Sequence, residues 1–144
     1  MKEILVDTNV LVSFLTDRNK AQQEQAAALF HGAADREHTL VLHSITLVEM
    51  VHVFLQIYKS DPLEVAHALG SLLEMPGVVT VEDVTWSQVL ERWPRVIPGF
   101  GDAIVATVAH QGRHDAVATF DAGLKKKLVQ QGTVLYWPQK QQGL

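Results

Sequence analysis

The chain has 144 residues, 47% of them hydrophobic, and its 16 acidic and 12 basic side chains give a net charge of -4. This length suits a single domain with one core, and the acidic balance argues against a protein that mainly coats nucleic acid without excluding an enzyme that acts on it. The absence of cysteine excludes disulfides, thiolate metal sites and cysteine nucleophiles. No apolar run approaches the roughly 20 residues of a membrane span and the first residues do not resemble a signal peptide, so we expect a cytoplasmic protein with no membrane association.

In the first half of the chain, short apolar runs alternate with amphipathic stretches. The pattern predicts a strand over 3–6, a short helix over 8–15 and a longer, Ala- and Gln-rich helix over 20–34. A second strand over 39–42 leads into a helix with Ser44 as its N-cap. The following helix has Asp61 as cap and Pro62 in its first position, and it ends near residue 75, before Pro76 and Gly77.

The second half of the chain repeats this alternation. We expect a strand over 78–81, a helix over 85–93 and a glycine-rich turn over 98–101 that places Asp102 at the head of a helix over 103–110. A strand over 116–120, a helix over 122–130 and a fifth strand over 133–137 follow. Short strands that alternate with helices predict an α/β fold, a parallel five-stranded sheet flanked by helices on both faces. The domain is expected over 1–138, with a frayed tail over 139–144.

Four acidic residues stand where such a fold places ligand sites. Asp7 and Asp121 each follow a strand, Asp102 begins a helix, and Glu49 interrupts the apolar face of another. Ligands bind at the carboxyl ends of parallel strands, and several carboxylates gathered there repel one another unless a cation neutralises them. Oxygen ligands select hard cations such as Mg²⁺, which activate water and hold phosphate esters. Taken singly, each aspartate is also an ordinary helix cap.

Four segments in this order resemble the PIN-domain family, and in length and layout the VapC-type toxins of toxin-antitoxin pairs: VDTNVLV, ITLVEMVHVF, GFGDAIVATVA and ATFDAGLKK. The resemblance implies a metal-dependent endoribonuclease that uses Mg²⁺ or Mn²⁺. It implies Asp7 and Asp102 as the main metal ligands, Asp121 as a residue that completes the site, and Glu49 as a catalytic group that acts through water. The residues implied as support are Thr8, Asn9 and Thr119.

The resemblance also implies three partners. RNA is the expected substrate, a cognate antitoxin protein is expected to cover the acidic groove, and the chain is expected to form a homodimer through the apolar stretch from Leu47 to Ile57. The basic residues Lys125, Lys126 and Arg113 are candidates for RNA contact, although a basic run near the end of a helix is also favoured by the helix dipole.

Two other functions fit parts of the pattern. A haloacid-dehalogenase-like phosphatase also has an aspartate after its first strand, but it requires D-x-D, and here Asn9 occupies the second position. A PIN scaffold that serves only in binding would keep the fold without turnover. The four intact acids favour the enzyme over the binding module.

Overall fold

The computed structural model describes residues 1–139, and its strands form one parallel sheet. The four strands are β1 (Lys2–Val6), β2 (His38–His43), β3 (Val78–Val81) and β4 (Ala116–Ala118), in the order β3-β2-β1-β4. In β1, Ile4 lies opposite Leu40 of β2 on one side and Ala116 of β4 on the other. The chain therefore extends the sheet to one side of β1 first and returns to the other side with β4.

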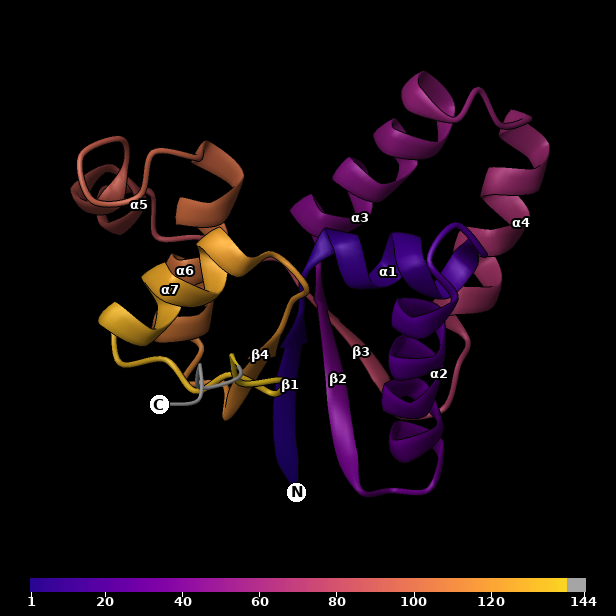
Figure 1. The fold of residues 1–144 in the computed structure, drawn as a ribbon, viewed down its shortest axis with the longest axis horizontal. Helices are drawn as coiled ribbons and strands as arrows, with labels where there is room; N and C mark the ends of the chain where they lie inside the picture. Colours follow the sequence, from indigo (N-terminus) through magenta and orange to yellow (C-terminus); the bar gives the residue numbers. More distant parts are fainter. Residues whose placement is uncertain (140–144) are drawn as a thin grey trace, which may run out of the picture.

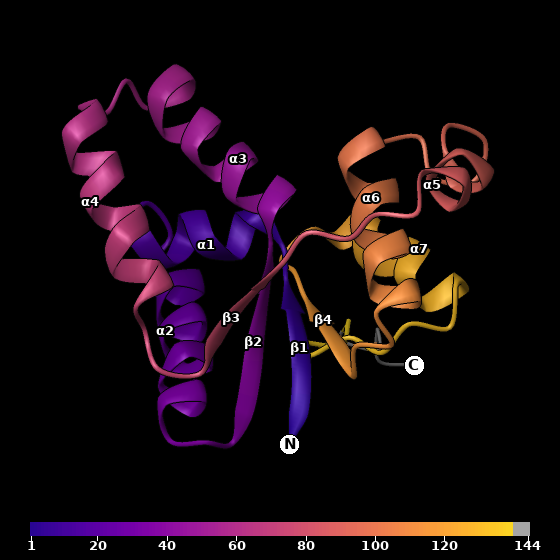
Figure 2. The ribbon, with the colours of Figure 1, turned by 180° about the vertical axis from the view of Figure 1, so that it is seen from behind.

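Helices cover both faces of this sheet. On one face lie α1 (Thr8–Leu15), α2 (Lys20–Ala34), α3 (Ser44–His52), its π-helical continuation η1 (Val53–Ile57) and α4 (Pro62–Leu73); on the other lie α5 (Trp86–Arg92), α6 (Phe100–Gln111) and α7 (Ala122–Gln130) (Figure 1). Figure 2 shows the same two groups from behind. Within residues 1–139, no helix is long and apolar enough to cross a lipid bilayer.

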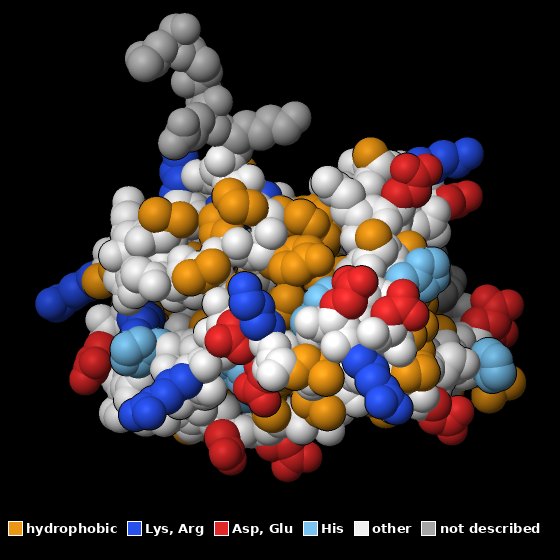
Figure 3. Space-filling model, turned by 90° about the horizontal axis from the view of Figure 1, so that it is seen from below, with side chains coloured by type: hydrophobic (Ala, Val, Ile, Leu, Met, Phe, Trp, Pro, Cys, Tyr) orange, Lys and Arg blue, Asp and Glu red, His pale blue; other side chains and the backbone are white. Residues whose placement is uncertain are grey.

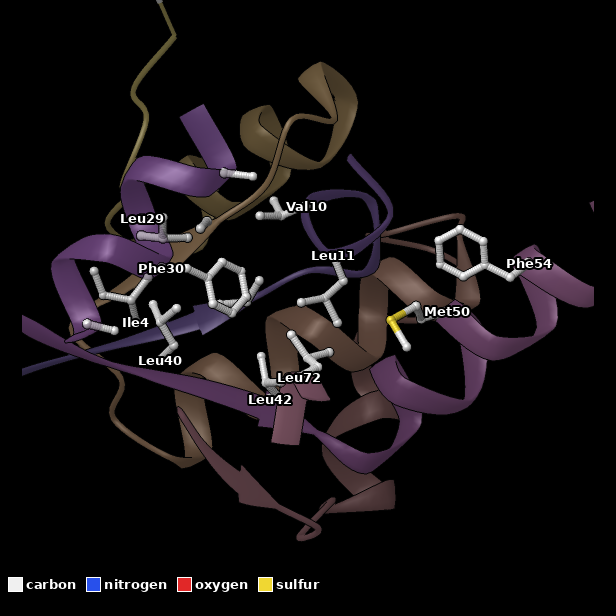
Figure 4. Close-up of a cluster of buried hydrophobic side chains, with 14 of the residues drawn as sticks. Ile4, Val10, Leu11, Leu29, Phe30, Leu40, Leu42, Met50, Phe54 and Leu72 are labelled. Carbon is white, nitrogen blue, oxygen red and sulfur yellow. The ribbon is translucent and has the colours of Figure 1, made fainter. Parts of the chain in front are cut away.

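The alternation of side chains along the central strand produces two cores. Ile4 and Val6 point into the cluster beneath α1 to α4, which Figure 4 shows around Leu11, Leu40 and Met50. Leu5 points the other way, into the cluster beneath α5 to α7. A strand that is buried on both faces has no polar alternation, which explains the continuous apolar run of β1.

The predicted fifth strand is wrong. Around residues 133–137 the structure has a single parallel bridge, between Val117 and Leu135. Val117 donates a backbone hydrogen bond to Val134, and Tyr136 donates one to Val117. The segment stops there because Pro138 has no N–H with which to continue the ladder. Residues 140–144 of the predicted tail lie outside the described residues.

Of the element ends that differ from the predictions, three bear on the site. His43, and not Ser44, caps α3, because its Nδ1 atom accepts a hydrogen bond of 3.1 Å from the N–H of Ile45. Helix α6 begins at Phe100, so Asp102 lies within its first turn and not ahead of it. Strand β4 ends at Ala118, where the backbone leaves the sheet to form the polar turn described below.

At the amino ends of the strands, the described residues present a surface of mixed charge (Figure 3). Figure 3 shows acidic and basic side chains interspersed across it. The carboxyl ends of the strands lie at the opposite edge, where β1 passes into α1 and β2 into α3 (Figure 1). The surface with mixed charge therefore lies at the amino ends of the strands, and the acidic residues are expected at the carboxyl ends.

Two glycines with similar backbone angles give a test of the packing between α2 and β3. Gly77 has φ +80°, and a Cβ atom there would lie 2.5 Å from the carbonyl oxygen of Ala33, whereas Gly132 has φ +78° and open space around it. Both Gly77→Ala and Gly132→Ala force alanine into a left-handed conformation that costs about 1–2 kcal/mol. We expect Gly77→Ala to lower the free energy of unfolding, measured in urea, by clearly more than Gly132→Ala does. Equal losses would show that the contact with Ala33 is relieved at no cost.

Candidate active site

The acidic residues meet where the order of the strands reverses. The chain leaves β1 for β2 on one side, and β4 lies on the other, so the carboxyl ends of β1 and β4 border a crevice. Asp7 follows β1 directly and caps α1, accepting a hydrogen bond of 2.8 Å from the N–H of Thr8. Its own N–H donates to Ala118 at the end of β4. The first predicted ligand therefore lies at the switch point of the sheet.

Asp7 is held by a network of polar groups that joins α1 to the end of β4. One of its oxygens, Oδ2, accepts from Asn9 Nδ2 at 3.1 Å and from the hydroxyl of Thr119 at 2.8 Å. The Thr119 hydroxyl also accepts from the N–H of Asp121, and Asn9 Oδ1 accepts from the N–H of Phe120. The predicted supporting residues Asn9 and Thr119 thus orient the carboxylate and shape the turn after β4.

The other three acids approach from separate helices. Asp121 caps α7, accepting from the N–H of Leu124 at 3.0 Å, and its side chain is exposed. Asp102 lies half-buried in the first turn of α6. Glu49 lies in α3, where its Oε2 atom accepts a hydrogen bond of 2.9 Å from the hydroxyl of Thr8. Thr8 is therefore a direct partner of a predicted catalytic acid.

Glycines before and within the first turn of α6 make room for these carboxylates. A Cβ atom on Gly99 would lie 3.0 Å from Asp102 Oδ2, and one on Gly101 would lie 3.2 Å from Glu49 Oε1. Larger side chains at either position would displace a carboxylate. The glycines of the predicted turn therefore allow the close approach of these two carboxylates.

An open pocket of about 380 Å³ connects the four acids. Four of its lining residues were missed in the sequence. Val12 and Ser13 lie one turn beyond the predicted supporting residues Thr8 and Asn9, and Val53 lies one turn beyond Glu49, so helical spacing from the predicted site residues would have found these three. The lining side chains are Asp7, Thr8, Asn9, Val12, Ser13, Glu49, Val53, Tyr58, Asp102 and Asp121.

Regular α-helical spacing does not predict that Tyr58 lines the pocket. Its N–H bonds to the carbonyl of Val53 five residues earlier, at 3.2 Å, as in a π-helix. In a continuous α-helix the residue one turn after Val53 would be Ile57, which here is 65% exposed. The wide turn of η1 therefore places an aromatic ring on the pocket wall.

Burial and like charges raise the pKa values of two of the acids. The pKa of Asp7 rises to about 6, chiefly because the side chain is buried; hydrogen bonds from Thr119 and Thr8 oppose the rise, and the charges of Asp102 and Glu49 add to it. The pKa of Asp102 is also raised, by burial first and then by Asp121 and Glu49. The four carboxylates are therefore close enough to repel one another.

These groups suit a hydrated hard cation better than a closed metal cage. Within residues 1–139, no three histidine, aspartate or glutamate side chains converge tightly enough to enclose an ion by themselves. Mg²⁺ is commonly held by one or two carboxylates and keeps several waters. The pocket offers oxygen donors, repelling carboxylates and space for such waters, so the residues present fit this kind of ion.

The remaining candidates lie outside the pocket. Lys125 and Lys126 are in α7, in the turn after Asp121, and do not line the pocket. Arg113 precedes β4, next to the backbone bond between Asp115 and Glu3, and thus lies toward the amino ends of the strands. The structure therefore does not bring Arg113 to the acids.

Most of the chain matches a known family of domains. Residues 4–127 match the family model of the PIN domain. The chain belongs to the PIN-domain family. Among curated protein sequences, no match to the chain is found.

Solved structures with this fold are distant in sequence. PAE2754 from Pyrobaculum aerophilum is 21% identical, with a TM-score of 0.64 over 88% of this chain and 79% of that chain. VapC20 of Mycobacterium tuberculosis, a toxin that cleaves the sarcin-ricin loop, is 16% identical, with a TM-score of 0.64 over 91% and 96%. VapBC2 from Rickettsia felis, bound to a DNA fragment from its promoter, is 16% identical, with a TM-score of 0.65 over 92% and 96%. At these identities the likeness establishes a shared fold.

The raised pKa of Asp7 predicts how stability changes with pH in EDTA. Between about pH 4 and pH 6, native Asp7 keeps a proton that the unfolded chain releases, so the native state loses stability as the pH rises. A shift of this size corresponds to about 3 kcal/mol in the free energy of unfolding. We expect urea unfolding to show this decline in the wild type and a much shallower one in Asp7→Asn. A similar decline in the variant would assign the pH dependence to other groups.

Proposed function

We propose that the chain is a metal-dependent endoribonuclease that hydrolyses phosphodiester bonds in RNA. The observation that carries the proposal is the convergence of Asp7, Glu49, Asp102 and Asp121 on one open pocket at the switch point of a PIN domain. Carboxylates that raise one another's pKa values carry a cost that a bound cation offsets.

In this proposal each acid has a separate task. Asp7, fixed by three hydrogen bonds, and Asp102 would hold the cation, and exposed Asp121 would complete the site. A bound Mg²⁺ or Mn²⁺ ion supplies Lewis-acid polarisation of a phosphate oxygen and eases deprotonation of water. Glu49, oriented by the Thr8 hydroxyl, accepts the proton of the attacking water. In-line displacement leaves a 5'-phosphate and a 3'-hydroxyl.

The same pocket argues against the phosphatase alternative. Asn9 occupies the position where that alternative requires a second aspartate, and its amide is used to orient Asp7 and the backbone of Phe120. An amide fixed in this way cannot act as a proton donor or acceptor in acid–base catalysis. The nuclease hypothesis therefore uses Asn9 as it is, whereas the phosphatase hypothesis requires a carboxylate at this position.

We further propose that the enzyme is the toxin of a type II toxin-antitoxin pair. Support comes from the fold that it shares with VapC20, a toxin, and with VapBC2. A cognate antitoxin would cover the acidic pocket, and a homodimer would bury apolar side chains of α3 and η1. Val48 and Ile57, which are 69% and 65% exposed, are the side chains that such contacts would cover.

Cleavage of RNA tests the nuclease. Purified wild-type protein is expected to cleave a mixed pool of structured RNAs with Mg²⁺ or Mn²⁺ and to leave it intact in EDTA. Asp102→Asn is expected to lower the rate by about a hundredfold or more, because it removes a proposed metal ligand. Asp35→Asn, which removes an exposed carboxylate at the end of α2, makes the same charge change and should retain the wild-type rate.

The two variants also separate the outcomes. Metal-dependent cleavage that is lost in Asp102→Asn and kept in Asp35→Asn supports the nuclease. Absence of cleavage together with absence of Mn²⁺ binding, measured by calorimetry, would leave a PIN scaffold that serves only in binding.

Growth of a bacterial host tests the toxin role separately. Expression of the wild-type chain is expected to arrest growth, because uncontrolled cleavage of RNA stops translation, whereas expression of Asp102→Asn is not. Co-expression of the small reading frame beside the gene should restore growth. Cleavage in vitro without growth arrest would keep the nuclease and reject the toxin role.

A further inference from the structure

A second hollow opens beside the acidic pocket. Its volume is about 480 Å³, and its lining includes one cation, Arg18, one carboxylate, Asp17, and the neutral residues Thr16, Gln23, Tyr58 and Ser60. Tyr58 lines the acidic pocket as well, so one ring borders both spaces. A chain that leaves the acidic pocket past this ring would enter the second hollow.

The guanidinium of Arg18 lies over an aromatic ring in this hollow. The guanidinium carbon of Arg18 lies 3.9 Å from the centre of the Tyr58 ring, and that ring packs edge-to-face against Phe54 at 5.6 Å. Arg18 is exposed, and its guanidinium forms no ion pair with any residue in the described part of the chain. Its planar set of donors is therefore oriented by stacking and available to a ligand.

The guanidinium of Arg18 is the group in this hollow that suits a phosphate. Guanidinium groups bind phosphate oxygens in a bidentate manner, and stacking on a ring reduces the conformational entropy lost when they do. A polyanion that enters a pocket with four carboxylates meets repulsion, and a cation just outside the pocket offsets part of it. The hydroxyl and amide groups of Thr16, Gln23 and Ser60 add neutral hydrogen-bonding groups around it.

We propose that Arg18, stacked on Tyr58, binds a backbone phosphate of the RNA strand that flanks the bond to be cleaved. This subsite rests on the proposed nuclease function and adds to it the path of the substrate, from the acids past Tyr58 toward the connection between α1 and α2. A strand whose scissile bond lies at the acids would continue past Tyr58, whose ring borders both spaces, so a flanking phosphate is the group that Arg18 would meet.

The test measures RNA binding in EDTA, which separates it from turnover. Fluorescence anisotropy of a labelled, short, mixed-sequence single-stranded RNA gives the affinity over a series of KCl concentrations. Arg18→Ala is expected to weaken binding about tenfold and to reduce the slope of log affinity against log salt by about 0.7 to 1, the loss of one phosphate contact. Lys2→Ala, which removes an exposed cation at the amino end of β1, should change neither.

Conservative variants test the stacked geometry. Arg18→Lys keeps the charge, so the salt slope should remain, but it should bind more weakly because the planar fork is lost. Tyr58→Phe keeps the ring face and should bind like the wild type, whereas Tyr58→Leu should weaken binding and keep the salt slope, because the Arg18 charge remains. This pattern distinguishes an oriented guanidinium from a general effect of net charge.

The outcomes separate this subsite from the nuclease itself. Wild-type affinity and salt slope in Arg18→Ala would overturn the subsite, while metal-dependent cleavage by the same preparation would leave the nuclease standing. Binding that depends on Arg18 without cleavage under any metal would support the subsite and reject the nuclease. Unchanged RNA binding combined with weaker binding of the protein encoded beside the gene would overturn the proposal in favour of a partner's carboxylate.

Discussion

The buried carboxylate of Asp7 is the constraint on which the site depends. It ends the central strand, caps α1 and accepts hydrogen bonds from Thr8, Asn9 and Thr119. Because two of these donors come from the start of α1 and one from the end of β4, the same oxygens hold the two sides of the crevice together. The Asp7 carboxylate thus links the two sides of the crevice, and the burial of its charge also destabilises the native state at neutral pH.

This double role explains why the site is assembled from helix starts. Asp7 and Asp121 cap helices and satisfy backbone N–H groups, while Asp102 lies in a first turn, where the helix dipole favours a negative charge. From the sequence, each aspartate could be interpreted either as a helix cap or as a metal ligand. In the structure Asp7 and Asp121 are caps and also line the acidic pocket, so capping does not argue against a role in binding.

Much of this arrangement could be predicted from the sequence because its signals are local. The bounds of α1, α2, β3 and α7 match the expected ranges, since caps and apolar spacing define them within a few residues. The misses depend on contacts between distant segments. A strand over 133–137 would need a further backbone N–H to continue its pairing, and Pro138 has none. The cap of α3 by His43 depends on the position of the imidazole ring, whose Nε2 atom lies 3.0 Å from the carbonyl oxygen of Asp83. The contact between Arg18 and Tyr58 joins residues about forty positions apart, which no spacing rule relates.

The π-helical segment η1 gives the pocket wall an unusual sensitivity to chain length. A π turn accommodates one residue more than an α turn, so it sets the rotational phase of the side chains that follow. Loss of a single residue between Val53 and Ile57 would restore the α-helical phase and rotate the next side chain by about 100° around the helix axis. Related chains with and without this extra residue would keep the same acids and the same sheet, yet present different side chains beside the acids.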